Sequence, residues 1–112
     1  MLTREEAAQG FAAVGSEPRL DVLLVLVRAG SAGLTVGEIQ ERLNVPGSTL
    51  SHHLRFLAAA ELVEQEKNGR SIVNRAAFNR LEALADYLLR ECCADETTAP
   101  RKGQAQSKTA AE

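Results

Sequence analysis

The chain has 112 residues and a net charge of −2; its composition is 45% hydrophobic and 25% charged. This length and composition predict one folded domain with a modest core and exclude a second domain of similar size. No apolar run approaches the roughly 18 residues of a membrane span, and residues 1–9 are polar and acidic, unlike a signal peptide. A cytoplasmic protein is therefore expected.

The N-terminal part of the chain is predicted to form two helices. Thr3 and Glu6 have the spacing of a capping box, so a first helix starts there, and Gly15 ends it. A second helix opens at Ser16 and ends at Gly30. Its leucines and valines are so dense that we expect it to be buried on most sides.

Two further helices, separated by a short turn, are predicted next. Thr35 and Glu38 have the spacing of a second capping box at the start of the third helix. After a tight turn over residues 44–47, a fourth helix capped by Ser48 runs to about Ala60. Its leucines recur at helical spacing, which predicts a buried face and directs the polar residues between them outward.

A β-hairpin is predicted directly after the fourth helix. Residues 62–66 alternate like a strand, residues 67–70 carry an Asn-Gly turn signal, and residues 71–75 form the return strand. Helix, short turn, helix and hairpin is the winged helix-turn-helix plan. The predicted fold is therefore mainly α with a small β-hairpin wing, in the order α-α-α-α-β-β-α.

A last helix is predicted over residues 77–94, and the composition changes after it. From residue 95 onward the chain contains no apolar residue larger than alanine, so it cannot bury enough surface to order itself. We therefore expect a folded domain over residues 1–94 and a disordered tail over residues 95–112.

The polar face of the fourth helix and the hairpin loop form a candidate DNA interface. A helix fits the major groove, where its polar side chains meet base edges and phosphates. The alternative is an ordinary solvent-exposed surface that binds nothing. The net charge of −2 also argues mildly against nucleic-acid binding. Residues 46–60 nevertheless contain no acid. The candidate contacts are Ser48, Thr49, Ser51, His52, His53, Arg55, Lys67, Asn68 and Arg70.

Cys92 and Cys93 are the two cysteines of the chain, adjacent near the end of the predicted last helix. Cytoplasmic thiols are reduced, so a close pair is expected to be reactive or to bind a soft, thiol-seeking atom. The alternative is simple packing, because Cys92 continues the apolar stripe of the helix. Cys93 lies off that stripe, which favours the ligand interpretation.

The number of thiols limits which metals or metalloids the pair could bind. Tetrahedral zinc needs four donors, which would require both pairs of a dimer. Trivalent arsenic or antimony needs three ligands, and the third could be water, a thiol of a partner chain, or a carbon already on the arsenic. The last possibility favours a methyl or aryl arsenical.

Several segments closely resemble the ArsR/SmtB family of transcriptional repressors. Residues 47–57, Gly-Ser-Thr-Leu-Ser-His-His-Leu-Arg-Phe-Leu, resemble its recognition helix, residues 60–63 and 69–70 its wing, and residues 16–20 the start of its second helix. The resemblance covers about residues 7–93. It implies a homodimer joined by the first and last helices, bound to a palindromic operator until an effector lowers its affinity. Nothing in the sequence predicts an enzyme.

Departures from the family locate the expected effector site. Where the founding arsenic sensors carry Cys-Val-Cys, this chain has Thr35, Val36 and Gly37, and its last helix lacks the histidines of the zinc sensors. Cys92 and Cys93 resemble the arsenic-sensor subgroup with thiols at the end of the last helix. We therefore predict a repressor that a trivalent arsenical (arsenite, antimonite or a methyl or aryl arsenical) releases by binding this pair. The alternatives are a response to thiol redox, reactive sulfur or another soft metal, and a dimeric protein-interaction module.

Overall fold

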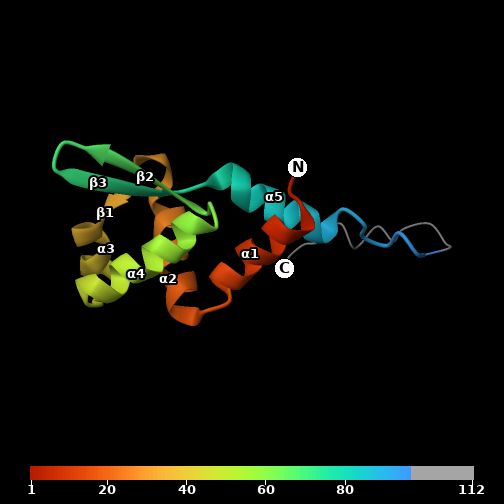
Figure 1. The fold of residues 1–112 in the computed structure, drawn as a ribbon, viewed down its shortest axis with the longest axis horizontal. Coiled ribbons are helices and arrows are strands. Elements are labelled where there is room, and N and C mark those ends of the chain that lie inside the picture. Colours follow the sequence, from red (N-terminus) through yellow and green to blue (C-terminus); the bar gives the residue numbers. More distant parts are fainter. Residues whose placement is uncertain (97–112) are drawn as a thin grey trace.

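The computed structural model describes residues 1–96 and has the winged helix-turn-helix fold that the sequence predicts (Figure 1). No helix within these residues is long and apolar enough to cross a membrane. The predicted tail lies outside the described residues, apart from residues 95 and 96. The elements in chain order are α1 (Arg4–Val14), α2 (Glu17–Ala29), the 3-10 turn η1 (Gly30–Ala32), β1 (Leu34–Thr35), α3 (Val36–Leu43), α4 (Gly47–Ala59), β2 (Val63–Asn68), β3 (Ser71–Ala76) and α5 (Phe78–Leu89).

Both predicted capping boxes are confirmed. Glu6 donates its backbone N–H to Thr3 Oγ1 at 3.0 Å, and Thr3 donates its own to Glu6 Oε1 at 2.9 Å. Thr35 and Glu38 repeat the pair at 3.3 and 2.9 Å. Each box satisfies two backbone donors that a helix start would otherwise leave unpaired, so these starts are fixed locally.

The predicted cap of α4 is wrong. The helix begins at Gly47, and the N-cap is Pro46, whose backbone is extended (φ −63°, ψ 147°). The first helical bond runs from the backbone N–H of Leu50 to the carbonyl of Pro46 at 3.0 Å. Ser48 therefore lies inside the first turn, where its exposed hydroxyl makes no capping bond.

The hairpin belongs to a three-stranded antiparallel sheet with the order β1-β3-β2, not to an isolated pair of strands as predicted. In β1, Leu34 pairs with Asn74 of β3. Asn74 is fully buried; it donates to the Leu34 carbonyl at 3.2 Å and accepts from Gln65 Nε2 of β2 at 2.8 Å. One buried amide thus joins all three strands.

The hairpin turn lies one residue later than predicted. Asn68 pairs with Ser71, which leaves Gly69 and Arg70 as the two turn residues. Gly69 has φ +66° and Arg70 is not among the positive-φ residues, as in a turn that needs glycine at its first central position.

The core lies where α2, α3 and α4 pack together and against the sheet. The predicted stripe of α4 is confirmed, because Leu50, Leu54 and Leu57 are at most 1% exposed. The expectation that α2 is buried on most sides is only partly met, since an outer stripe remains 36 to 40% exposed. That outer stripe consists of Leu20, Leu24 and Val27.

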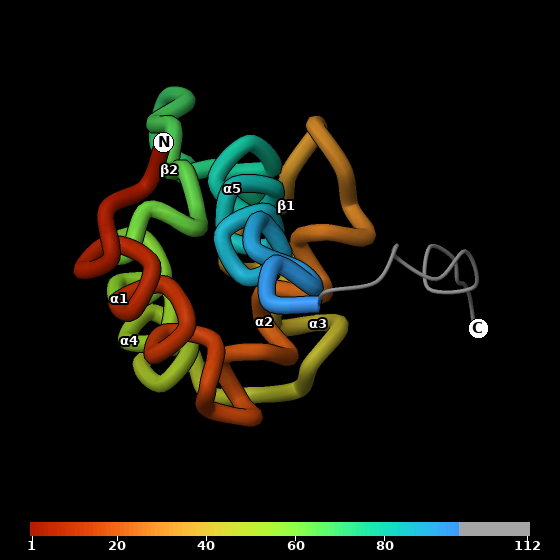
Figure 2. Tube along the Cα trace, turned by 90° about the vertical axis from the view of Figure 1, so that its right-hand side faces the viewer, coloured from red at the N-terminus to blue at the C-terminus, as the bar shows by residue number. Residues whose placement is uncertain are grey.

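α1 and α5 extend beyond the sheet at the end of the molecule opposite the hairpin (Figure 1). Gly10 of α1 permits their close approach, because a Cβ there would lie 2.9 Å from the methyl groups of Leu84. α1 also lies beside α4 (Figure 2).

The last helix ends earlier than predicted, at Leu89. The next backbone bonds span three residues, as between the N–H of Cys92 and the carbonyl of Leu89 at 2.8 Å, and Cys93 has φ +63°. Leu88 and Leu89 are 66% and 64% exposed, so the described residues give a further helical turn little packing support.

Candidate nucleic-acid interface and thiol pair

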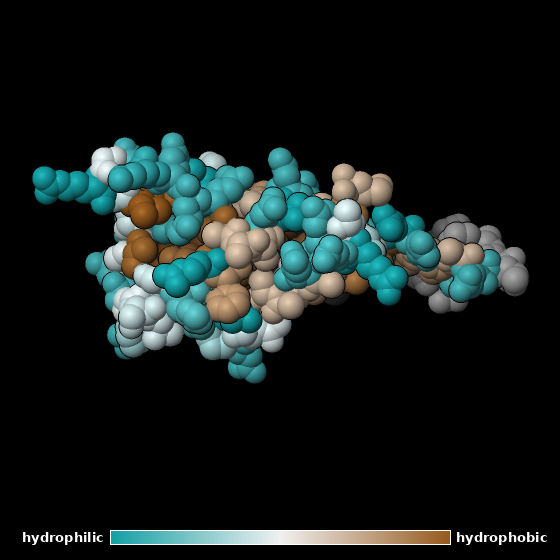
Figure 3. Space-filling model, in the orientation of Figure 1, coloured by the Kyte–Doolittle hydropathy of each residue, from teal (hydrophilic) through white to brown (hydrophobic). Residues whose placement is uncertain are grey.

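α4 presents its predicted polar residues on two sides. Ser51 and Arg55, one helical turn apart, line a groove of about 270 Å³ beneath the hairpin, together with Gln65 and Ile72. Figure 3 shows apolar atoms gathered in the hollow between the hairpin and the helices. Ser48 and Thr49, in the first turn of α4, are exposed. This side of α4 offers hydroxyls and one long cation to a ligand outside the chain.

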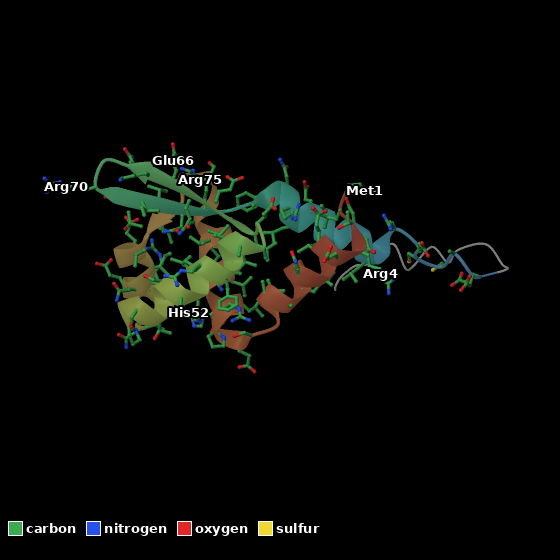
Figure 4. The ribbon with its side chains drawn as sticks, viewed as in Figure 1. Met1, Arg4, His52, Glu66, Arg70 and Arg75 are labelled. Carbon is green, nitrogen blue, oxygen red and sulfur yellow. The ribbon has the colours of Figure 1, made fainter. Side chains whose placement is uncertain are left out.

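His52 lies on the side of α4 away from the hairpin (Figure 4). The His52 ring packs edge-on against Phe56, with 4.9 Å between the two ring centroids. The guanidinium carbon of Arg19 lies 4.8 Å from the centroid of the Phe56 ring. This stack of Arg19, Phe56 and His52 was not predicted. The sequence signal that could have indicated it was Phe56, a large aromatic residue outside the leucine stripe of α4. In the structure Phe56 is 46% exposed.

His53 differs from its neighbour because it is half-buried. Its Nδ1 atom is buried without a hydrogen-bond partner among the described residues. Burial, followed by the nearby charges of Arg19 and His52, lowers the pKa of His53 below its usual value. The imidazole is therefore neutral at pH 7, which makes it a weaker candidate for phosphate contact than the sequence indicated.

The hairpin carries exposed cations at its tip. Lys67, Asn68 and Arg70 are all exposed, and Arg70 projects from the end of the wing (Figure 4). Glu66 is neutralised by Arg75, whose Nη1 lies 2.9 Å from its Oε1. Within residues 1–96, neither Lys67 nor Arg70 has an ion-pair partner. The wing is therefore free to present positive charge to a polyanion.

The two thiols lie close together, on a turn and not on the predicted last helix. Cys92 Sγ and Cys93 Sγ lie 3.5 Å apart; Cys92 is exposed and Cys93 is half-buried. The left-handed backbone of Cys93 replaces the helical geometry that would separate adjacent side chains by about 100°. Because Cys92 is exposed, simple core packing within one chain does not account for it.

Hydrogen bonding keeps Cys93 neutral. The bond with Cys92, followed by one with Glu96, raises the pKa of the Cys93 thiol to about 11. Within the described part of the chain, no group of three or more His, Cys, Asp or Glu side chains is placed to hold a metal ion. The described residues of one chain thus bring two sulfur atoms together and form no four-donor zinc site.

A helix-turn-helix with an exposed hairpin beside it defines the winged helix-turn-helix class of DNA-binding transcription regulators. Residues 14–66 match the model of a family described as a helix-turn-helix domain. The chain is 33% identical over 74 residues to the transcriptional repressor SdpR of Bacillus subtilis, covering 66% of this chain and 80% of SdpR. It is 31% identical over 81 residues to the transcriptional activator HlyU of Vibrio cholerae, covering 72% of each chain.

A solved structure of a transcriptional regulator is also similar to this chain. An ArsR-like transcriptional regulator from Rhodococcus sp. RHA1 matches with a TM-score of 0.69 and 34% identity, covering 81% of this chain and 82% of that one. The chain belongs to the ArsR family of DNA-binding transcriptional regulators. It is a regulator and not an enzyme, as the sequence indicated.

Proposed function

We propose that this regulator is a homodimeric repressor that leaves its operator when a trivalent arsenical binds Cys92 and Cys93. The observation that carries the proposal is the separation of 3.5 Å between the two sulfur atoms. Sulfur ligands select soft centres, and two thiols within reach of one atom satisfy a methyl or aryl arsenical. Arsenite and antimonite would take a third ligand from water or from a partner chain.

The binding step balances without a redox partner. An organoarsenous acid carries two hydroxyl groups on arsenic; two As–O bonds break, two As–S bonds form, and two waters leave with the thiol protons. Since the pKa of Cys93 is about 11, its thiol is protonated at neutral pH and carries a proton for a leaving hydroxyl.

The position of the thiol pair supports a link to dimerisation. The pair begins three residues after Leu89, the second of the two exposed leucines at the end of α5, Leu88 and Leu89. Exposed apolar side chains at the end of an α1–α5 pair fit a surface that a second copy covers. An arsenic atom bound three residues beyond Leu89 would change that contact and therefore the spacing of the two recognition helices.

The contacts proposed for DNA are those of the predicted interface. Ser48, Thr49, Ser51 and Arg55 on α4 face the major groove, His52 lies beside them, and Lys67, Asn68 and Arg70 on the wing reach the backbone. His53 is retained at the edge of this set because it is half-buried. Two copies of so small a contact surface on a palindrome compensate for the net charge of −2 on each chain.

Release by arsenicals is expected to depend on both thiols. In fluorescence anisotropy with operator DNA selected from a random pool, phenylarsonous acid should release the wild type. Cys92→Ser and Cys93→Ser should bind the operator normally but need roughly 100-fold more arsenical, because one thiol loses the chelate effect. Ala94→Ser, a neighbouring exposed position with both thiols intact, should respond as the wild type does. Normal release of both cysteine variants would exclude the pair as the sensor.

Arg55 is expected to contribute directly to operator affinity. Arg55→Ala should weaken binding by roughly tenfold and reduce the salt dependence by about one charge, as expected for a lost phosphate contact. Anisotropy titrations at several salt concentrations measure both quantities. Arg28→Ala, which removes an exposed cation at the far end of α2, should leave them unchanged. Equal effects of the two substitutions would contradict the proposed face.

Redox sensing is the second candidate, favoured by the same short distance between sulfur atoms. A peroxide would accept two electrons and the two thiol protons, forming a Cys92–Cys93 disulfide and two waters. The raised pKa of Cys93 does not separate the two candidates, because the thiolate is the reactive form in both. Mass spectrometry after peroxide treatment distinguishes the candidates, since only redox sensing requires the loss of two hydrogens per chain together with release of DNA.

A further inference from the structure

A cleft of about 310 Å³ lies between α1, the first turn of α2 and the end of α4, on the side where α1 and α4 run beside each other (Figure 2). Four alanines from α1 and the end of α4 form an apolar wall, and Gln9, Arg19 and Phe56 complete the lining. The volume lies at the lower end of the range of small-molecule sites, roughly 300 to 1,000 Å³. It therefore suits a ligand with one ring.

Arg19 brings a fixed positive charge to this cleft. Its Nε donates to the Ala13 carbonyl at 2.7 Å, its Nη2 reaches the Ala12 carbonyl at 3.5 Å, and its guanidinium lies over Phe56. These contacts hold the half-buried group in place without neutralising it. In the described part of the chain, the ion pairs are Arg75 with Glu66 and Arg80 with Glu61, so Arg19 has no carboxylate within 4.0 Å.

We infer that the cleft binds a small organic anion with an apolar body, such as a monocyclic aromatic carboxylate, whose carboxylate pairs with Arg19. A preorganised guanidinium matches a carboxylate with two parallel hydrogen bonds. The alanine wall removes the apolar body from water. A neutral molecule of the same shape leaves the charge of Arg19 unpaired and is bound more weakly.

The occupant would also contact the recognition helix. Phe56 belongs both to the cleft lining and to the stack with His52, one of the residues proposed to contact DNA. A ligand that displaces Phe56 or shifts Arg19 therefore moves His52. This site is separate from the thiol pair, so it constitutes a second input to the same DNA-binding unit.

Calorimetric titration of the full chain with benzoate tests the inference. We expect saturable binding of one benzoate per chain and roughly tenfold weaker binding of benzamide, its neutral analogue. Arg19→Gln should lose at least about tenfold in benzoate affinity. Arg28→Gln, the same substitution at the other end of α2, should bind as the wild type does. Absence of saturable binding, or equal affinity for benzoate and benzamide, would overturn the inference.

A second variant keeps the test decisive if Arg19→Gln unfolds, since Arg19 also holds carbonyls at the end of α1. Ala59→Phe places a ring in the cleft while the guanidinium stays, so benzoate binding should be lost in a protein with a normal thermal transition. Benzoate should also shift operator affinity at least about threefold in the wild type and not in Ala59→Phe. Unimpaired benzoate binding by Ala59→Phe refutes the site, and unchanged operator affinity in the wild type refutes the coupling. Cys92→Ser should bind benzoate normally whether or not the arsenical proposal holds.

Discussion

Simultaneous replacement of Leu88 and Leu89 by glutamate should convert the protein to a monomer and weaken operator binding by roughly 100-fold or more. Both side chains are more than 60% exposed in one chain, at the outer end of the α1–α5 pair. In a dimer they would lie against the partner, where two buried carboxylates per chain cost far more than a small interface gains. A monomer contacts one half of a palindrome and loses the effective concentration that the second half-site provides.

Sedimentation analysis and anisotropy measure the two effects separately. Ile72→Glu is the control for oligomeric state, because it places one carboxylate on an exposed apolar residue of the wing, far from α5. It should leave the protein dimeric. A dimer that survives both glutamates would show that another surface joins the chains, and a monomeric wild type would contradict the proposed homodimer.

Gly33→Ala is expected to destabilise the protein more than the same substitution at Gly30 or Gly37. Gly33 has φ 70° and ψ −176°, a backbone region that is essentially restricted to glycine. A Cβ there would lie 2.6 Å from the backbone oxygen of Asn74 and 2.8 Å from Cγ1 of Val73. Strain and overlap with a backbone atom together should cost roughly 3 kcal/mol or more.

Substitutions at Gly30 and Gly37 separate the cost of backbone strain from the cost of overlap with neighbouring atoms. Gly30 has a similar backbone (φ 75°, ψ −156°), but a Cβ there would meet nothing within 4 Å, so Gly30→Ala should cost only the strain, about 1 to 3 kcal/mol. Gly37 lies in α3 with open space around it, and Gly37→Ala should stabilise the protein by roughly 0.5 to 1 kcal/mol. Urea unfolding at one fixed protein concentration gives the order. If Gly33→Ala costs no more than Gly30→Ala, the close approach of Gly33 to β3 does not limit which residue can stand there.

Sequence predicted those parts of the fold whose causes lie within a few residues. The capping boxes at Thr3 and Thr35 each depend on a partner three positions away, and the leucine stripe of α4 repeats every three or four residues. β1 has only two residues, and its partner Asn74 lies 40 positions further along the chain. No local pattern could therefore reveal it.

In the candidate site, too, the features with local causes were predicted and those that depend on packing between helices were not. The polar residues of α4 and the hairpin are exposed largely as predicted, because periodicity determines which side chains face outward. The stack of Arg19, Phe56 and His52 joins two helices and follows from their packing, which the sequence does not show. The apolar pattern continues to Cys92, so it predicted a helix there. In the structure the helix ends at Leu89, because helices of this length depend on packing partners that one chain does not supply.

Thr35 serves two elements at once: it pairs with Val73 as part of β1, and it caps α3. Thr35 and the side-chain amide of Asn74 therefore connect the hairpin, the sheet and the start of α3, which we expect to move together. A hinge at the base of the wing would have to break both connections. We therefore expect a signal from either end of the molecule to turn these connected elements as a rigid body, with the geometry between wing and helix preserved.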